Sequence, residues 1–239
     1  MPQFFLAREN IDNNRGLIKD SDYRHLINVR RIKTGDSLQC RDEEGNPYNG
    51  RVVEINENSI VLELQIEKID SHQQVNLHLF MSLLKGKNFE LSIQKAVEVG
   101  VSSITPIVSE RTIPQIDQKV DKLLERWNRI ALEAAKQSLR QSIPEVNRPM
   151  HFEESLGALK DKSCGICGHP NASMIEKGFF HKPYDDYYLL VGPEGGFSDN
   201  EISLAEKKGW HIFSFGTNHL RAETAAIVLP ALIIHEVRK

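Results

Sequence analysis

Short apolar runs alternate with helix-forming segments from residue 75 to the end of this 239-residue chain. Branched and aromatic residues in such runs are typical of buried strands, whereas apolar residues three and four positions apart indicate helices. Strands are predicted at 75–83, 102–109, 163–168, 187–191 and 211–215, and helices at 89–99, along the stripe 120–135, and from near 198 and 222. Because this alternation buries a mostly parallel sheet beneath helices, we expect one α/β domain over residues 75–239.

The first 70 residues have a different pattern. Between Asp36 and Lys68, the alternating runs SLQCR, YNGRVVEI and SIVLELQIE are separated by DEEGNP and NENS, which are turn-forming sequences. This part is predicted to be a small antiparallel β meander or barrel. The domain boundary is expected within Ile69 to Gln74, which gives two domains, 1–70 and 75–239.

Composition excludes several classes of protein. The chain is 40% hydrophobic and 26% charged, which indicates a folded globular protein. The amino terminus does not resemble a signal peptide, and the longest apolar run, Ala225 to Ile234, is shorter than the roughly 20 residues of a membrane helix. We therefore expect a cytoplasmic protein without a membrane span.

Cysteine usage also fits a reducing compartment, because Cys40, Cys164 and Cys167 are an odd number. The C-x-x-C in SCGICGHP, with His169 nearby, could be half of a zinc site. No second motif completes it, so small apolar residues on a buried strand are the favoured interpretation and no metal is expected.

The net charge of −3 gives no overall sign of nucleic-acid binding, but positive charge is concentrated locally. Tyr23 to Gly35, YRHLINVRRIKTG, contains several basic residues and no acid. A solvated helical face and a nucleic-acid surface both remain open interpretations of this segment.

The segment VGPEGGFSDNEI, Val191 to Ile202, places glycines between a predicted strand and a helix start. Ser198 and Glu201 form a capping-box pattern, and glycines in such a position let a ligand approach the backbone closely. The loop is neither G-x-G-x-x-G nor a P-loop, and Glu194 puts a carboxylate where phosphate would lie. The segment therefore predicts a binding loop for a ligand other than pyrophosphate; a tight turn with glycines needed only for geometry is the alternative.

A second loop, in FGTNHLRAETA, repeats this layout and should lie at the same edge of the sheet, so that both loops share one pocket. Glu223 is explained by the helix dipole alone. Arg221 is not, because a cation at a helix amino terminus is disfavoured by about 0.3–1 kcal/mol. An anionic or carbonyl partner in the pocket, or an ion pair with Glu223 or Glu194, would explain it.

VGPEGGFSDNEI and LRAETA, in this order, resemble the paired motifs of the small-subunit ribosomal RNA uridine N3-methyltransferases, the RsmE family of the SPOUT superfamily. The likeness extends to HLINVRRIKTGD, KNFELSIQKAVEVGVSSITPIVSERT and WNRIALEAAKQSLRQSIPEV, and covers nearly the whole chain. The resemblance implies an amino-terminal PUA-like β-barrel and an α/β SPOUT methyltransferase domain with a carboxy-terminal trefoil knot. It also implies a homodimer that uses S-adenosylmethionine to methylate small-subunit ribosomal RNA.

Site residues follow in part from the chemistry of methyl transfer, which suggests the roles of Arg221 and Glu223, and in part from the resemblance. Arg221 would stabilise negative charge on the uracil carbonyls, and Glu223 would orient Arg221 or assist proton removal, with plain helix stabilisation as its alternative role. The implied cofactor-binding residues are His169, Pro170, Gly192, Pro193, Glu194, Gly195, Gly196, Phe215, Gly216, Leu220, Arg221, Ala222 and Thr224. The implied RNA phosphate contacts are Arg8, Arg24, Arg30, Arg31, Lys33, Lys85, Lys87, Arg111 and Arg140.

The chain departs from the family pattern at two places. Thr217-Asn218-His219 replaces a Pro-Arg-Ile type of sequence before Leu220, and Leu139 stands where a glycine is common. Three rival functions remain: a SPOUT enzyme for another RNA position, a noncatalytic RNA-binding ribosome assembly factor, and, remotely, a nucleotide-dependent oxidoreductase that the missing phosphate loop disfavours.

Overall fold

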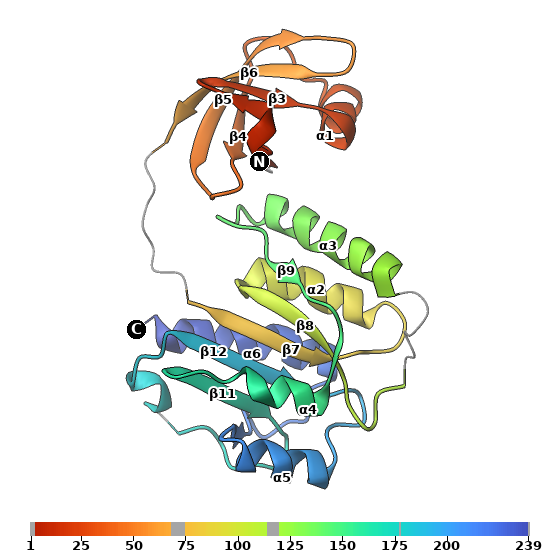
Figure 1. Cartoon of the computed structure of the whole chain (residues 1–239), viewed down its shortest axis with the longest axis vertical. Coiled ribbons are helices and arrows are strands. Elements are labelled where there is room, and N and C mark those ends of the chain that lie inside the picture. The colour runs from red at the N-terminus through yellow and green to blue at the C-terminus, as the bar shows by residue number, and fades with distance from the viewer. Residues whose placement is uncertain (1–2, 68–74, 114–119, 177, 239) are drawn as a thin grey trace. The chain divides into compact units, whose positions relative to one another are not determined.

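The computed structural model describes residues 3–67, 75–113, 120–176 and 178–238 (Figure 1). The chain divides into two compact units. The first comprises residues 1–72 together with 135–143, and the second comprises residues 73–134 and 144–239. The boundary predicted at Ile69 to Gln74 lies wholly within 68–74, outside the described residues.

The first unit is built on a six-stranded sheet with the order β1-β4-β5-β6-β3-β2. Its central strands β4, β5 and β6 pair antiparallel, which confirms the predicted meander, whereas β1 pairs with β4 in parallel. The core contains Phe4, Leu26, Leu38 and Leu62. Its elements are β1 Phe4–Phe5, η1 Arg8–Asn10, β2 Ile11–Asp12, β3 Arg15–Ile18, α1 Asp20–His25, the π-helix η2 Leu26–Arg30, β4 Ser37–Arg41, β5 Pro47–Ile55 and β6 Ile60–Ile66.

The second unit contains a seven-stranded sheet whose pairs are all parallel, which confirms the α/β prediction. The main order is β10-β8-β7-β12-β11-β13, with β9 beside β8. The strands are β7 Leu77–Ser82, β8 Ser103–Val108, β9 Glu145–Val146, β10 Met150–His151, β11 Ser163–Gly168, β12 Asp186–Val191 and β13 His211–Phe213. β12 therefore lies centrally, between β7 and β11.

Helices cover both faces of this sheet (Figure 1). α2 and α6 pack together, with α6 against β7 and β12, while α4 and α5 contribute to a core with Phe80 and Leu190 on the other face. The bounds are α2 Asn88–Val99, α3 Val120–Gln137, α4 Phe152–Ser155, η3 Leu156–Ala158, η4 Phe179–His181, α5 Asp199–Lys207 and α6 Ala222–Val237. Within the described residues, no helix has both the length and the apolar character needed to span a membrane.

Local sequence chemistry explains where several helices begin and end. The predicted capping box is confirmed, because Ser198 Oγ accepts the Glu201 amide at 3.3 Å and Glu201 Oε2 accepts the Ser198 amide at 2.8 Å. Gly100, at φ 126°, ends α2 as predicted. The short elements β9, β10 and α4 were not predicted.

Leu139 occupies the position that the family pattern assigns to glycine, and its φ is +56°. The amide of Arg140 donates to the carbonyl of Ala135 at 3.1 Å, which is the six-to-one bond of a Schellman helix end with Leu139 at the left-handed position. A side chain with a Cβ is strained there, and this strain explains the usual glycine.

We expect Leu139→Gly to raise the thermal stability of the protein. Removing the Cβ relieves about 1–2 kcal/mol of left-handed strain, and the more flexible unfolded chain offsets about 0.5–1 kcal/mol of that gain. Scanning calorimetry should show the unfolding transition that involves residues 135–143 at higher temperature. Leu139→Ala, which retains the Cβ, is the control, and equal stability of the two variants would contradict this explanation.

Candidate active site

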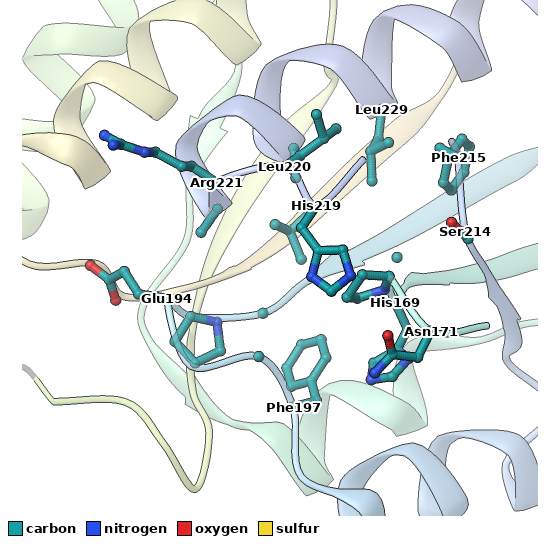
Figure 2. Close-up of a pocket in the computed structure, with 18 of the residues that line it drawn as sticks. His169, Asn171, Glu194, Phe197, Ser214, Phe215, His219, Leu220, Arg221 and Leu229 are labelled. Carbon is teal, nitrogen blue, oxygen red and sulfur yellow. The ribbon is translucent and has the colours of Figure 1, made fainter. Parts of the chain in front are cut away.

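Three loops follow β11, β12 and β13 at the same edge of the sheet, because these strands are parallel. Together with the start of α6, they surround a cavity of about 1000 Å³ (Figure 2). Glu194 and Leu220, from the two glycine-containing loops, both line it. The prediction that these loops share one pocket is therefore confirmed.

The loop after β12 needs glycine at two positions for different reasons. A Cβ on Gly192 would lie 3.2 Å from the Phe197 amide nitrogen and 3.3 Å from the Phe197 ring, so the chain packs closely there. Gly196 has a φ of +67° and donates its amide to the Pro193 carbonyl at 2.9 Å, which closes a tight turn. The loop thus presents its backbone to the cavity in a closely packed, tightly turned conformation that larger residues would disturb.

Contacts between loops hold the remaining walls in place. The His169 amide donates to the Phe213 carbonyl at 2.9 Å, and the Ser214 amide donates to the Ser173 carbonyl at 2.9 Å. The Ser214 hydroxyl donates to the Gly216 carbonyl at 2.8 Å. Glu194 Oε1 accepts the Lys85 amide at 2.9 Å, which joins the glycine loop to the segment after β7.

Arg221 and Glu223 lie at the beginning of α6. Arg221 is the amino-terminal cap residue of this helix, and its side chain is 86% exposed. Its Nη1 lies 4.0 Å from Glu223 Oε1, and the Glu223 side chain is only 16% exposed. Figure 2 shows Arg221 and Glu194 on one side of the cavity and Ser214 and Phe215 on the other. The ion pair between Arg221 and Glu223 that the sequence suggested is therefore long and weak. The Arg221 guanidinium remains accessible to a ligand.

Nearly all the predicted cofactor-binding residues line this cavity; Thr224 does not, although it lies in the first turn of α6. Sequence reasoning missed several other lining residues. Phe197 lies within the glycine segment VGPEGGFSDNEI, and His219 lies within Thr217-Asn218-His219, where the chain departs from the family pattern. The position of each residue in a predicted binding loop could therefore have indicated it. The missed residues include Asn88, Asn171, Phe197, Ser214, Thr217, Asn218, His219 and Leu229.

The predicted RNA contacts are divided between the two units. Arg24, Arg31 and Lys33 are exposed in the first unit, on α1 or just after η2, and Arg8 is exposed in η1. Arg30 is partly buried there, and its Nη1 has no hydrogen-bond partner within the described residues. Lys85, Lys87 and Arg111 are exposed in the second unit, with Arg111 lining the cavity.

Arg140 is placed differently from the other predicted RNA contacts. It is only 9% exposed, and its carbonyl accepts a hydrogen bond from the side-chain amide of Gln3. The neighbouring Lys136 pairs with Asp22 at 2.7 Å. The segment after α3 is thus tied into the first unit, and Arg140 does not stand on the surface of the chain.

The cysteines are buried free thiols, as expected for strand residues. Burial raises the pKa of Cys164 to about 12, and burial together with the charges of Glu201 and Glu206 raises the pKa of Cys167. Such thiols are poor ligands and nucleophiles at neutral pH. The described ranges of the chain contain no group of three or more His, Cys, Asp and Glu residues arranged to hold a metal ion.

Two family models match the sequence. A model described as an RNA methyltransferase domain matches residues 71–234, and one described as an RNA methyltransferase PUA domain matches residues 18–65. The chain is 32% identical over 234 residues to the ribosomal RNA small subunit methyltransferase E 2 of Borreliella burgdorferi. This likeness covers 95% of the present chain and 94% of the relative.

Solved structures agree with the sequence comparison. The ribosomal RNA small subunit methyltransferase E of Neisseria gonorrhoeae, solved bound to S-adenosyl methionine, superposes with a TM-score of 0.87 at 28% identity, covering 97% of this chain and 96% of that one. A Legionella pneumophila protein solved in complex with the bound cofactor SAM gives a TM-score of 0.84 at 26% identity, covering 98% of this chain and 97% of that one. Together with the family models, these likenesses show that the chain belongs to the RsmE family of RNA methyltransferases.

Proposed function

We propose that this protein transfers a methyl group from S-adenosylmethionine to N3 of a uridine in small-subunit ribosomal RNA. The observation that carries the proposal is the single cavity shared by the glycine loop after β12 and the Leu220-Arg221-Ala222 segment. Catalysis is assigned to residues 75–239 and RNA docking mainly to residues 1–70. The trefoil knot of the family is inferred for the carboxy-terminal segment, which pairs with the loop after β11 through Ser214.

The cavity fits a sulfonium nucleoside better than a phosphate-bearing cofactor. Its volume of about 1000 Å³ is large enough for such a ligand, and Leu220, Leu229 and Phe197 supply apolar walls. Glu194, Asp199 and Glu223 line it beside Arg111 and Arg221, so that carboxylates outnumber guanidinium groups and favour a positively charged ligand. The Gly192 and Gly195 backbone allows close approach, as a nucleoside in this loop requires.

When bound, S-adenosylmethionine supplies an electrophilic methyl group and would leave as S-adenosylhomocysteine. This chain must align the uridine, let the N3 proton pass to solvent or to the Glu223 carboxylate, and stabilise the charge that develops on the uracil. Alignment contributes through proximity and orientation. The Arg221 guanidinium stays protonated and cannot accept a proton, but its donors can bind carbonyl oxygens on which negative charge develops. The 4.0 Å separation of Glu223 Oε1 from Arg221 Nη1 supports a role for Glu223 in orienting that guanidinium.

The exposed basic residues around α1 and η2 favour docking of RNA phosphates. We expect RNA affinity to fall as salt rises, and Lys33→Ala to reduce the slope of log affinity against log salt by about 1, because one counterion-releasing contact is lost. Fluorescence anisotropy with a small-subunit RNA fragment measures both. Lys160→Ala, which removes an exposed lysine outside this segment, should leave the slope unchanged. An RNA affinity independent of salt would exclude phosphate binding by this basic surface.

A homodimer and a cytoplasmic location complete the proposal. Leu91 of α2 and Leu232 of α6 are each 42% exposed, on two helices that pack together, and they offer an apolar contact for a second copy. Light scattering after gel filtration should give twice the chain mass for the wild type and one chain mass for Leu232→Glu. Val53→Glu, which changes an exposed residue of β5, should remain dimeric, and a monomeric wild type would contradict the dimer.

The proposed reaction is tested by nucleoside mass spectrometry of small-subunit RNA from cells that lack the protein. Loss of 3-methyluridine supports the assignment, and its return requires the intact gene rather than an Arg221 variant. Loss of another methylated nucleoside would favour a different RNA position. Unchanged RNA, with no binding of S-adenosylmethionine in calorimetry, would favour a noncatalytic assembly factor.

A further inference from the structure

The turn that follows β8 is braced by hydroxyl groups. Thr112 Oγ1 accepts the Ser109 amide at 2.9 Å, and the Thr112 amide donates to the Ser109 carbonyl at 3.0 Å. Ser109 Oγ lies 3.0 Å from Ser82 Oγ, at the end of β7, and both serines are buried. The backbone on both sides of Arg111 is therefore held to the end of the parallel sheet.

A buried carboxylate connects this turn to α5. Glu201 is 8% exposed; its Oε1 accepts the Glu110 amide at 2.9 Å, and its Oε2 accepts the Ser198 amide. Because Ser198 directly follows the glycine loop and its Phe197 anchor, Glu201 links the turn after β8 to that loop. The Glu201 carboxylate therefore holds both the backbone that carries Arg111 and the carboxy-terminal end of the glycine loop.

The Arg111 side chain binds the glycine loop itself. Its Nη1 donates to the Gly195 carbonyl at 2.8 Å. A Cβ on Gly195 would lie 3.5 Å from both Cβ and Cδ of Arg111, so the aliphatic stem rests against the glycine backbone. On the adjacent residue, the Glu194 carboxylate binds the Lys85 amide. The loop is consequently held at Glu194 by the segment after β7, and at Gly195 by the segment after β8.

We propose that Arg111 is a positioning residue that sets the conformation of the methyl-donor loop, a role beyond the phosphate contact predicted from sequence; the inference rests on the function proposed above. Glycine loses more backbone freedom on ordering than other residues. Ordering a loop that contains Gly192, Gly195 and Gly196 before the ligand binds therefore reduces the entropic cost of binding and raises affinity. A hydrogen bond from a guanidinium to the Gly195 carbonyl provides that order at the centre of the loop.

The two roles of Arg111 are separated by measuring cofactor affinity without RNA. We expect Arg111→Met, which keeps the aliphatic stem, to raise the dissociation constant for S-adenosylmethionine about tenfold in calorimetry, as expected for losing one charge-assisted hydrogen bond. Arg111→Lys, one bond shorter, should recover most of the affinity. The loss should appear in cofactor affinity measured without RNA, and the melting temperature of the free protein should be unchanged, because the bond acts on the loop alone.

Arg129→Met is the matched control, because it removes an exposed arginine on α3 that does not line the cavity; its cofactor affinity should equal that of the wild type. Unchanged cofactor affinity in Arg111→Met, with weaker RNA binding, would overturn the positioning role and leave Arg111 as a phosphate contact. Failure of the wild type to bind S-adenosylmethionine would instead overturn the proposed function, and this inference with it.

Discussion

Replacing Arg221 with methionine lowers the methyl-transfer rate at saturating S-adenosylmethionine by about 100- to 1000-fold, the loss typical of removing one donor to developing charge. The side chain is 86% exposed, so its removal leaves no cavity and should not change the stability of the fold. Single-turnover kinetics on small-subunit RNA measures the rate, and calorimetry measures cofactor affinity, which should stay within about threefold because the interaction forms mainly in the transition state.

Arg221→Lys tests whether charge alone is sufficient. Lysine keeps the positive charge but loses the planar fork that can bind a carbonyl with two donors, so we expect its rate to remain at least about tenfold below the wild type. Glu223→Gln should have a smaller effect than either Arg221 variant if Glu223 only orients the guanidinium. A wild-type turnover rate in Arg221→Lys, with normal cofactor binding, would show that the catalytic role is assigned to the wrong residue.

Replacing Gly192 with valine raises the dissociation constant for S-adenosylmethionine by about 100-fold, equivalent to about 2.7 kcal/mol. A Cβ alone would already lie 3.2 Å from the Phe197 amide nitrogen, and the two additional methyl groups must displace either Phe197 or the ligand. Calorimetry with purified protein measures this directly, and Gly192→Ala should fall between the wild type and the valine variant.

Gly157→Ala is the control for the Gly192 series, because a Cβ there would meet no heavy atom within 4 Å and it lies in η3, away from the cavity lining. Its cofactor affinity should match the wild type. Wild-type affinity in Gly192→Val, with a folded protein confirmed by circular dichroism, would mean that the ligand does not approach the glycine backbone.

Features that depend on neighbouring residues in the sequence were predictable. The Ser198–Glu201 capping box, the stop at Gly100 and the buried strands at 163–168 and 187–191 follow from local hydrogen bonding and hydrophobic patterning, and the structure confirms them. The shared pocket was also predictable, because parallel strands put the loops that follow them at one edge. The Leu139 departure acquired a physical meaning only when its φ of +56° was known.

Features that depend on distant residues were not predictable from the pattern. Arg111 looks like any exposed arginine in the sequence, and only the fold brings it to the Gly195 carbonyl, 84 positions away. Arg140 is buried because the segment after α3 joins the first unit, a contact that no local periodicity encodes. The two-residue strands β9 and β10 are too short to produce a recognisable alternation.

The central claim is that the cavity lined by the loops after β11, β12 and β13 binds a methyl donor, and that the protein transfers its methyl group to a uridine of small-subunit RNA. Incubating purified protein and unmodified small subunits with isotopically labelled S-adenosylmethionine, then digesting the RNA for nucleoside mass spectrometry, tests it directly. With S-adenosylmethionine supplied near the wild-type dissociation constant, we predict label in 3-methyluridine with the wild type and almost none with Gly192→Val, whose site would be nearly empty at that concentration. Label in a different nucleoside, or equal label from the Gly192→Val protein, would contradict the account.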